Sequence, residues 1–155
     1  MQVSLPLVLE AVYACWAVGD IDGFMDAFAD DFAYTNHMSP EFVPFAGTVH
    51  GKVAFRRQLQ KISDNFDVIH YTPVQIIPRN DLIRAQITFL YRHKATGLTY
   101  GGRLRHVFQI KDQRIVKFDE FHDGERTRAF FELIASYEKS MQSAKVLDDK
   151  NGLCP

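Results

Sequence analysis

Four long strand-like stretches constrain the fold more than any other feature of this chain. They span residues 67–78, 82–93, 98–110 and 114–122. Short turn signals separate them, at residues 78–81, 95–97 and 111–114. Consecutive strands that are joined by short turns pair with one another as hairpins. The sequence therefore predicts an antiparallel sheet that occupies most of the chain after residue 66.

Helical periodicity surrounds this predicted sheet. The expected elements are a helix over 6–18, a second helix from Ile21 to the Asp30–Asp31 pair, a short strand over 32–37, a helix over 51–66 and a closing helix over about 126–138. The first helix is expected to bury Val8, Val12, Cys15 and Trp16, and the closing helix Phe130, Leu133, Ile134 and Tyr137. This order predicts an α+β fold in which a curved, mostly antiparallel sheet wraps around the helices and leaves a cavity between the layers.

The length of 155 residues suggests one domain, which we place at 1–138, with a flexible C-terminal tail over 139–155. The formal net charge of −1 gives no reason to expect binding to nucleic acid or to an anionic membrane. The uncharged run between Glu10 and Asp20 is too short to span a bilayer. We therefore expect no membrane association.

Cysteine use and early charge bear on the cellular compartment. Cys15 lies in a predicted apolar helix and Cys154 in the predicted tail, so we expect two free thiols rather than a disulfide framework. The first basic residue is Lys52, and both signal and transit peptides need basic residues near the N-terminus. These features favour a reducing cytoplasm.

The stretch KFDEFHD, residues 117–123, mixes aromatic and ionisable side chains on both faces of a predicted strand. Two registers with the preceding strand are open. A two-residue loop places His106 opposite Asp119, whereas a three-residue loop unites the even-numbered residues on one face. We prefer the second register because it gathers the apolar residues, and burial fixes register strongly. His106 and Glu120 then lie opposite or diagonal to each other.

A carboxylate in such surroundings is a candidate acid–base group. Leu104, Phe108 and Phe118 are expected to exclude water around Glu120, which raises the pKa of its carboxyl group, while a neighbouring imidazolium at His106 would lower it again. Acid–base catalysis near neutral pH depends on such tuning. A buried Glu–His pair with a purely structural role is the alternative.

Further residues are candidates for the wall of the cavity. Tyr34 and Asn36 share one face of the short strand, where they either line the pocket or anchor the following loop; Tyr100, Phe108, Phe118 and Trp16 are expected as pocket wall. His122 either assists Glu120 at the pocket mouth or faces water. The six histidines match no spacing typical of a metal site, and no phosphate-binding or dinucleotide motif occurs, so we expect neither metal nor cofactor.

The opposite face of the sheet is a candidate interface. Arg103, Arg105 and Val107 are expected on this outer face, and Phe121 follows on the last strand. A surface that mixes basic and apolar residues favours a homodimer contact over a nucleic-acid site.

The chain resembles the nuclear-transport-factor-2-like superfamily, in its SnoaL-like and ketosteroid-isomerase-like branch. The resemblance covers roughly residues 6–138, and its carriers are AVGDIDGFMDAFADDFAY after Trp16, HGKVAFRRQL from His50 and VFQIKDQRIVKFDEFHD from Val107. It implies a cystatin-like, cone-shaped cavity between a curved sheet and the helices, usually in a homodimer. It also implies a range of activities, because one fold carries many functions.

Three branches of the superfamily suggest roles for individual residues. Glu120 and His106 resemble the acid and histidine of SnoaL-like polyketide cyclases, with Glu where Asp is usual. Tyr34, Asn36 and Glu120 resemble part of the limonene-epoxide hydrolase site, but Ile87 and Phe89 stand where its Arg-x-Asp is found. In ketosteroid isomerases the base lies on the first strand, where this chain has Asn36.

The leading hypothesis is a cofactor-free enzyme of the cyclase, isomerase or hydrolase type that acts on an apolar, oxygen-bearing substrate. Glu120 would move a proton, His106 would orient or share it, and Tyr34, Asn36 and Tyr100 would hydrogen-bond a substrate oxygen as charge develops. The alternative is a non-catalytic module that binds a small ligand or assembles as a dimer on the same fold. A protein that binds its partner through the outer sheet face is a third hypothesis.

Overall fold

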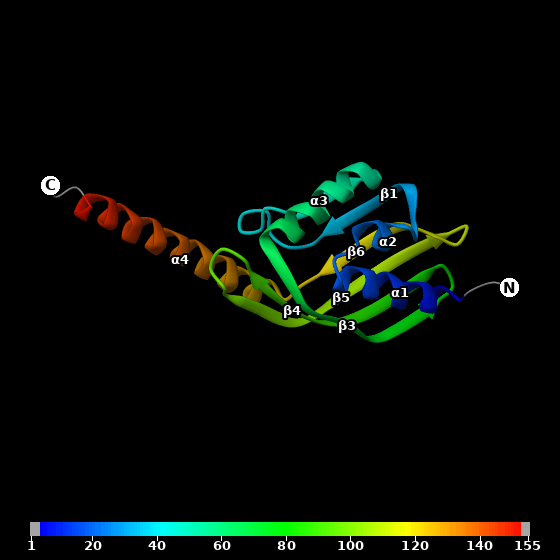
Figure 1. Cartoon of the computed structure of the whole chain (residues 1–155). Helices are drawn as coiled ribbons and strands as arrows, with labels where there is room; N and C mark the ends of the chain where they lie inside the picture. The colour runs from blue at the N-terminus through cyan, green and yellow to red at the C-terminus, as the bar shows by residue number, and fades with distance from the viewer. Residues whose placement is uncertain (1–3, 153–155) are drawn as a thin grey trace.

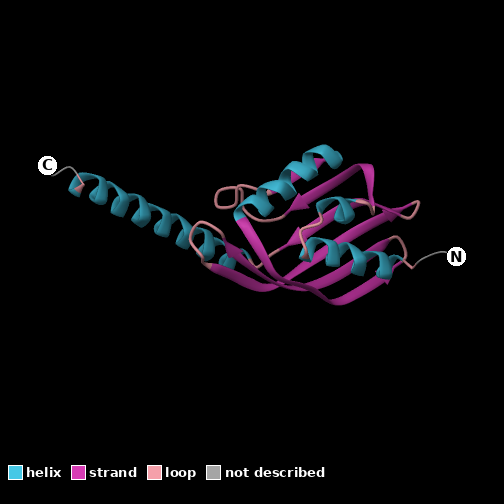
Figure 2. Ribbon diagram, viewed as in Figure 1, coloured by secondary structure: helices cyan, strands magenta, loops and turns pink. Residues whose placement is uncertain are grey.

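The computed structural model describes residues 4–152 and forms one mixed sheet covered by helices on one face (Figures 1 and 2). The elements are α1 (Leu5–Ala17), α2 (Ile21–Met25), β1 (Phe28–Asn36), β2 (Gly47–His50), α3 (Gly51–Asn65), β3 (Phe66–Arg79), β4 (Leu82–His93), β5 (Thr99–Lys111), β6 (Arg114–Phe121) and α4 (Gly124–Asn151). The six strands are ordered β2-β1-β6-β5-β4-β3. All neighbours pair antiparallel except β1 and β6, which are parallel. The predicted α+β class is confirmed.

The β5–β6 hairpin contains both of the registers that the sequence left open. Its two-residue turn has left-handed backbone at Asp112 (φ 49°) and Gln113 (φ 63°), as tight hairpin turns require. Lys111 pairs with Arg114 next to this turn, but the ladder shifts by one residue between Gln109 and Ile110. A β-bulge of this kind inserts one extra residue into one strand, so the pairing beyond it is offset by one residue. Beyond it His106 pairs directly with Glu120, so the preferred register is confirmed at the site.

The segment from Ile21 to Asn36 differs from its prediction. The predicted helix up to Asp31 is wrong, because α2 ends at Met25 and β1 begins at Phe28. Phe28 and Phe32 both face the core, at 0% exposure each, and a spacing of four residues suits a helix face as well as a strand face. Pairing of β1 with β6 decides between the two. β2, in a stretch expected to be a loop, was missed entirely; it forms the outer edge of the sheet beside β1.

The helices cover the concave face of the sheet. The face of α1 that is buried against the sheet differs from the predicted one. Its buried residues are Leu9, Val12, Tyr13 and Trp16, whereas Val8 and Cys15 are only partly buried. The positions i, i+3, i+4 and i+7 of this set form a regular helical stripe. This difference brings the Tyr13 hydroxyl into the protein interior. Asp20 caps α2, since its side chain accepts a hydrogen bond from the Gly23 N–H.

The closing helix is much longer than predicted, since α4 continues to Asn151 instead of ending near residue 138. Its first turns cover the open end of the fold through Thr127, Phe130 and Ile134, while Leu133 and Tyr137 are exposed rather than buried. The part of the predicted tail up to Asn151 is therefore helical. The domain boundary at residue 138 and the flexibility of the tail stay predictions, and Cys154 lies outside the described residues.

The outer face of the sheet carries Arg103 and Arg105 as exposed side chains and Val107 half-buried, as expected. Phe121 is also half-buried and stacks on the ring of His37, with centroids 4.3 Å apart. Among the helices formed by residues 4–152, none has the length and apolar character needed to cross a membrane.

Candidate active site

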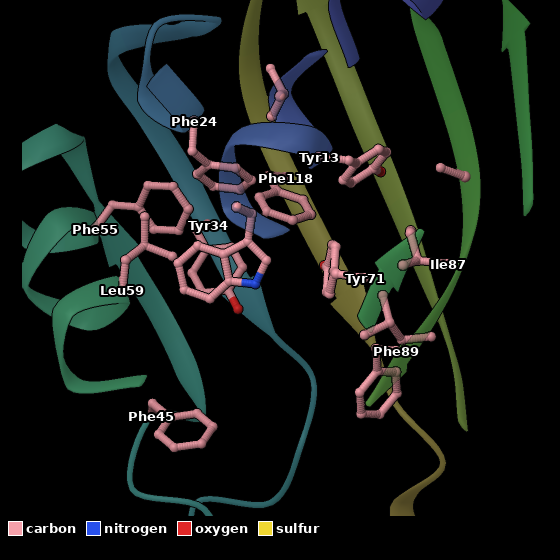
Figure 3. Close-up of a cluster of buried hydrophobic side chains, with 14 of the residues drawn as sticks. Tyr13, Phe24, Tyr34, Phe45, Phe55, Leu59, Tyr71, Ile87, Phe89 and Phe118 are labelled. Carbon is pink, nitrogen blue, oxygen red and sulfur yellow. The ribbon is translucent and has the colours of Figure 1, made fainter. Parts of the chain in front are cut away.

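A narrow pocket lies between the sheet and the helices. The space open to the centre of a water molecule inside it is about 50 Å³. Most of the lining side chains are aromatic: Trp16, Phe24, Tyr34, Met38, Phe45, Phe55, Leu59, Ile62, Phe66, Tyr71, Tyr91, Tyr100, Leu104, Phe118, Glu120, His122, Phe130 and Phe131. In Figure 3, Phe55 and Leu59 reach from α3 toward Tyr34, with Phe118 and Tyr71 nearby. Among residues 4–152, no lysine or arginine lines the pocket.

Glu120 is the one carboxylate in this aromatic wall, and its side chain is only 13% exposed. The sheet surrounds it with donors, because the antiparallel neighbour β5 supplies His106 and the parallel neighbour β1 supplies Asn36, directly alongside. Its Oε2 accepts from His106 Nε2 at 2.8 Å. Its Oε1 lies 3.1 Å from His122 Nε2, 3.1 Å from the Tyr34 hydroxyl and 3.2 Å from Asn36 Nδ2.

The pKa of Glu120 is lowered, and this decides between the two opposing effects expected from the sequence. Burial raises the pKa of this carboxyl group, but the hydrogen bonds from His106 and His122 outweigh burial and hold it well below its usual range. The sequence argument left the net direction open, since it weighed only His106 against the surrounding apolar side chains.

His106 lies behind Glu120, with a side chain that is fully buried and outside the pocket wall. Burial lowers the pKa of His106, although the hydrogen bond to Glu120 opposes this shift. Its Nδ1 lies 2.9 Å from the Tyr13 hydroxyl. Burial also raises the pKa of Tyr13 well above normal, so Tyr13 keeps its proton and can donate. The neutral imidazole therefore accepts from Tyr13 at Nδ1 and donates its Nε2–H to Glu120.

His122 is fixed by a chain of hydrogen bonds that runs to the start of α4. Thr127 Oγ1 donates to the Asp123 carbonyl at 2.7 Å, so the Tyr100 hydroxyl must donate to Thr127. The Tyr100 oxygen is then free to accept from His122 Nδ1, 3.4 Å away. His122 Nε2 faces a carboxylate oxygen of Glu120, so both ring nitrogens of His122 lie beside oxygens that can accept a proton.

The Tyr13→Phe substitution should loosen this arrangement. Without the Tyr13 hydroxyl, His106 Nδ1 loses its donor and the ring is held by Glu120 alone, so its orientation is less firmly fixed. We expect a loss of about 1 kcal/mol in the free energy of unfolding and a roughly tenfold loss of any Glu120-dependent activity. Nitrogen NMR of His106 should report the loss of the hydrogen bond at Nδ1. Tyr137→Phe on the exposed part of α4 is the matched control, and equal effects in both variants would contradict this role for Tyr13.

In the described range, residues 4–152, no three His, Cys, Asp or Glu side chains gather closely enough to hold a metal ion. The polar groups that face the pocket are instead tyrosine hydroxyls, Glu120 and His122. Such groups move and share protons.

The pattern of the SnoaL-like domain family matches residues 9–118, which is most of the chain. The chain belongs to the SnoaL-like family. Glu120 and His122 lie just beyond the matched range, so the family match establishes the scaffold on which they stand. No curated protein matches this SnoaL-like chain.

Solved structures with the same fold are distant in sequence. A candidate SnoaL-like polyketide cyclase from Mesorhizobium loti shares 21% identity at a TM-score of 0.63, covering 77% of this chain and 100% of the other. An NTF2-like protein of unknown function from Burkholderia pseudomallei shares 18% identity at a TM-score of 0.73, covering 86% and 98%. A ketosteroid-isomerase-like protein from Catenulispora acidiphila, in complex with trimethylamine, shares 14% identity at a TM-score of 0.66, covering 77% of this chain and 88% of the other. These similarities show the fold.

The SnoaL-like fold separates the predicted site residues into two groups. Those that line the pocket are Trp16, Tyr34, Tyr100, Phe118, Glu120 and His122. Those that lie behind the wall are Asn36 and His106, which hydrogen-bond Glu120, and Phe108, which stacks on Phe118 at 4.6 Å. His122, left open by the sequence, has a side chain only 6% exposed and contacts Glu120 instead of facing water.

Three tyrosines of the site were missed. Tyr13 was missed because the predicted buried face of α1 did not include it. Tyr71 and Tyr91 lie on predicted strands, and Tyr91 pairs directly with Tyr100 across the β4–β5 hairpin. Extending the hairpin argument to that turn would have found Tyr91, whose hydroxyl accepts from Trp16 Nε1 at 2.8 Å.

Proposed function

We propose that this SnoaL-like protein is a cofactor-free acid–base enzyme for a small, apolar, oxygen-bearing substrate. The observation that carries the proposal is the contact between the Glu120 carboxylate and the His122 imidazole in one aromatic pocket. A proton acceptor and a proton donor on adjacent sites are what enolisation, isomerisation and ring closure require. The name of the Mesorhizobium loti relative, a candidate polyketide cyclase, agrees with this class of chemistry.

Three polar residues of the site have parts in the proposed reaction. Glu120 takes a proton from a carbon next to a substrate carbonyl, and the electrons of that C–H bond form the enol double bond. His122 gives a proton to the carbonyl oxygen as negative charge develops there. In an isomerisation, Glu120 returns its proton to a different carbon of a conjugated enol while the enol O–H proton goes back to His122. In a ring closure, the enol carbon attacks a second carbonyl, the enol O–H proton goes back to His122, and the proton on Glu120 goes to the new alkoxide oxygen. His106 holds Glu120 in place from behind.

Isotope exchange tests this proposal without knowledge of the natural substrate. Small cyclic ketones and β-diketones are incubated with the protein in D₂O, and exchange of C–H for C–D is followed by proton NMR. We expect exchange above the buffer rate for members that fit the aromatic pocket, and none above it with the Glu120→Gln variant. A wild-type protein that exchanges no member of the panel would count against the proposal.

A second candidate function is binding of a small organic cation without catalysis. Aromatic faces and a carboxylate attract ammonium groups, and this pocket offers both, with no lysine or arginine among the described residues that line it. The Catenulispora acidiphila relative, which is in complex with trimethylamine, favours the same reading. Calorimetry with trimethylamine distinguishes the two functions. Tight binding together with no isotope exchange would select this candidate.

The outer sheet face stays a proposed homodimer contact. A shallow groove there is lined by residues that include Ile77, Arg84, Arg105 and Phe121. If two copies meet on this face, Arg105→Glu should weaken the dimer at least tenfold, because it places a reversed charge at a buried contact. Sedimentation at several concentrations measures the change. Arg79→Glu, at the exposed end of β3, is the control, and an unaltered dimer in Arg105→Glu would rule this face out.

A further inference from the structure

The C-terminal half of α4 extends away from the rest of the molecule (Figure 1). Only Thr127, Phe130 and Ile134 of this helix are buried, and every described residue from Ala135 onward is exposed. At 1.5 Å per residue, the stretch from Ala135 to Asn151 reaches roughly 25 Å into solvent. Isolated helices of this length are marginal in water, so such an extension needs a stabilising partner.

One face of this extension is mostly apolar, with Asp148 at its C-terminal end. The α4 stripe consists of Leu133, Tyr137, Met141, Ala144 and Leu147. Steps of three and four residues keep these side chains on one side of the helix. Leu133, Tyr137, Met141 and Leu147 are 45%, 46%, 52% and 61% exposed. A continuous apolar stripe of this kind on a soluble surface marks a contact site.

We propose that the α4 stripe is covered by the α4 helix of a second copy of this chain, packed antiparallel. In this arrangement Tyr137 lies against the partner's Ala144, so a large side chain meets a small one. Leu133 lies against the partner's Leu147, and Met141 packs close to the partner's Met141. Twofold symmetry repeats each contact, as expected for a homodimer.

The charges beside the stripe select the antiparallel direction. Glu138 is brought next to the partner's Lys145 on one flank. On the other flank, Glu132, which also accepts from Arg128 of its own helix at 2.9 Å, is brought next to the partner's Lys150. Symmetry doubles each pair, which gives four complementary contacts between the helices. A parallel pair in register would instead set each stripe residue against its own copy and form neither contact. The charge pattern is therefore self-complementary in one direction.

The paired helices would also support the pocket. Phe130 and Phe131, at the start of α4, belong to the pocket wall. Antiparallel pairing carries the end of the partner's helix to the level of Phe131. The association is independent of the proposed function, because it rests on exposed residues that do not touch Glu120 or His122.

The stripe is tested by charge insertion in the full chain. Tyr137→Glu combined with Met141→Glu should weaken association at least tenfold in sedimentation equilibrium and lower the helical circular dichroism as α4 frays. Gln142→Glu combined with Val146→Glu adds the same charge to the other side of the same helix and should leave both readouts unchanged. Equal effects of the two double variants, or a monomeric wild-type chain at 100-fold varied concentration, would overturn the proposal.

The direction is tested by charge reversal. Glu138→Lys alone and Lys145→Glu alone should each weaken association about tenfold, because each creates two like-charge contacts. Mixing the two single variants restores both opposite-charge contacts, so a heterodimer should form with wild-type affinity. Failure of the mixture to associate would exclude the antiparallel pairing. Arg105→Glu on the outer sheet face should leave the α4 contact intact, and loss of all association in Arg105→Glu would assign the dimer to the sheet instead.

Discussion

Replacing Glu120 by glutamine should slow the proposed proton transfer by roughly 10² to 10⁴-fold, the usual contribution of a positioned general base. The amide keeps the size and shape of the side chain but cannot accept a proton at neutral pH. It also presents an N–H group where His106 or His122 donates, so one of the present hydrogen bonds must be lost. The exchange rate in D₂O, measured with any substrate that the wild type turns over, gives the effect directly.

The Glu120→Gln experiment has a matched control on the same strand. Asp119→Asn removes a neighbouring carboxylate on the opposite face of β6, which is paired with His37 at 2.8 Å. It should leave the exchange rate within about twofold. Far-ultraviolet circular dichroism should show that both variants fold. A Glu120→Gln protein with wild-type activity would remove Glu120 from the reaction.

Replacing His106 by leucine should destabilise the protein by about 3 to 5 kcal/mol at pH 7, because two buried groups lose their partner at once. The Glu120 carboxylate loses its shortest hydrogen bond, and the Tyr13 hydroxyl loses its acceptor. Leucine has a similar volume, so little of the effect comes from an empty space. Urea unfolding measures it. His70→Leu, at an exposed histidine of β3, should cost less than about 1 kcal/mol.

The His106→Leu deficit should shrink as the pH falls. In the wild type the pKa of Glu120 is lowered on folding, so its contribution to stability is complete above the unfolded-state pKa and fades as the pH falls toward the folded one. The His106→Leu variant already lacks part of this contribution at pH 7, so it has less to lose as the pH falls. Combined with Glu120→Gln, His106→Leu should cost at least 1 kcal/mol less than it costs alone. A deficit that does not depend on pH and adds fully to that of Glu120→Gln would mean that His106 does not support the carboxylate.

Hairpin geometry made the centre of the site predictable from sequence. Short turns and the requirement to bury Phe108 and Phe118 on one face were enough to set His106 opposite Glu120. The turn alone favours the other register, and a bulge at Gln109 and Ile110 reconciles the two. Local turn chemistry and burial therefore pointed in different directions, and burial decided the pairing at the site.

Long-range contacts account for what the sequence did not predict. A spacing of four between Phe28 and Phe32 fits both a helix and a strand, and only pairing with β6 makes this segment a strand. The lowered pKa of Glu120 depends on His122 as well as His106. Tyr34 and Asn36, both on β1, also hydrogen-bond the Glu120 carboxylate. The sequence left His122 open between assisting Glu120 and facing water. The number of donors to Glu120, and with it the sign of the pKa shift, could therefore not be read from the hairpin pattern.

The charge state of Glu120 in the folded protein tests the central claim most directly. Infrared difference spectra between the wild type and Glu120→Gln are recorded from pH 5 to pH 8. They show the C=O stretch of a carboxylic acid, which is distinct from the amide C=O of the glutamine, if the Glu120 carboxyl group is protonated. The hydrogen bonds to Glu120 predict an ionised carboxylate at every one of these pH values, with no such band. A protonated Glu120 at pH 7 would contradict the assignment of this residue as the proton acceptor.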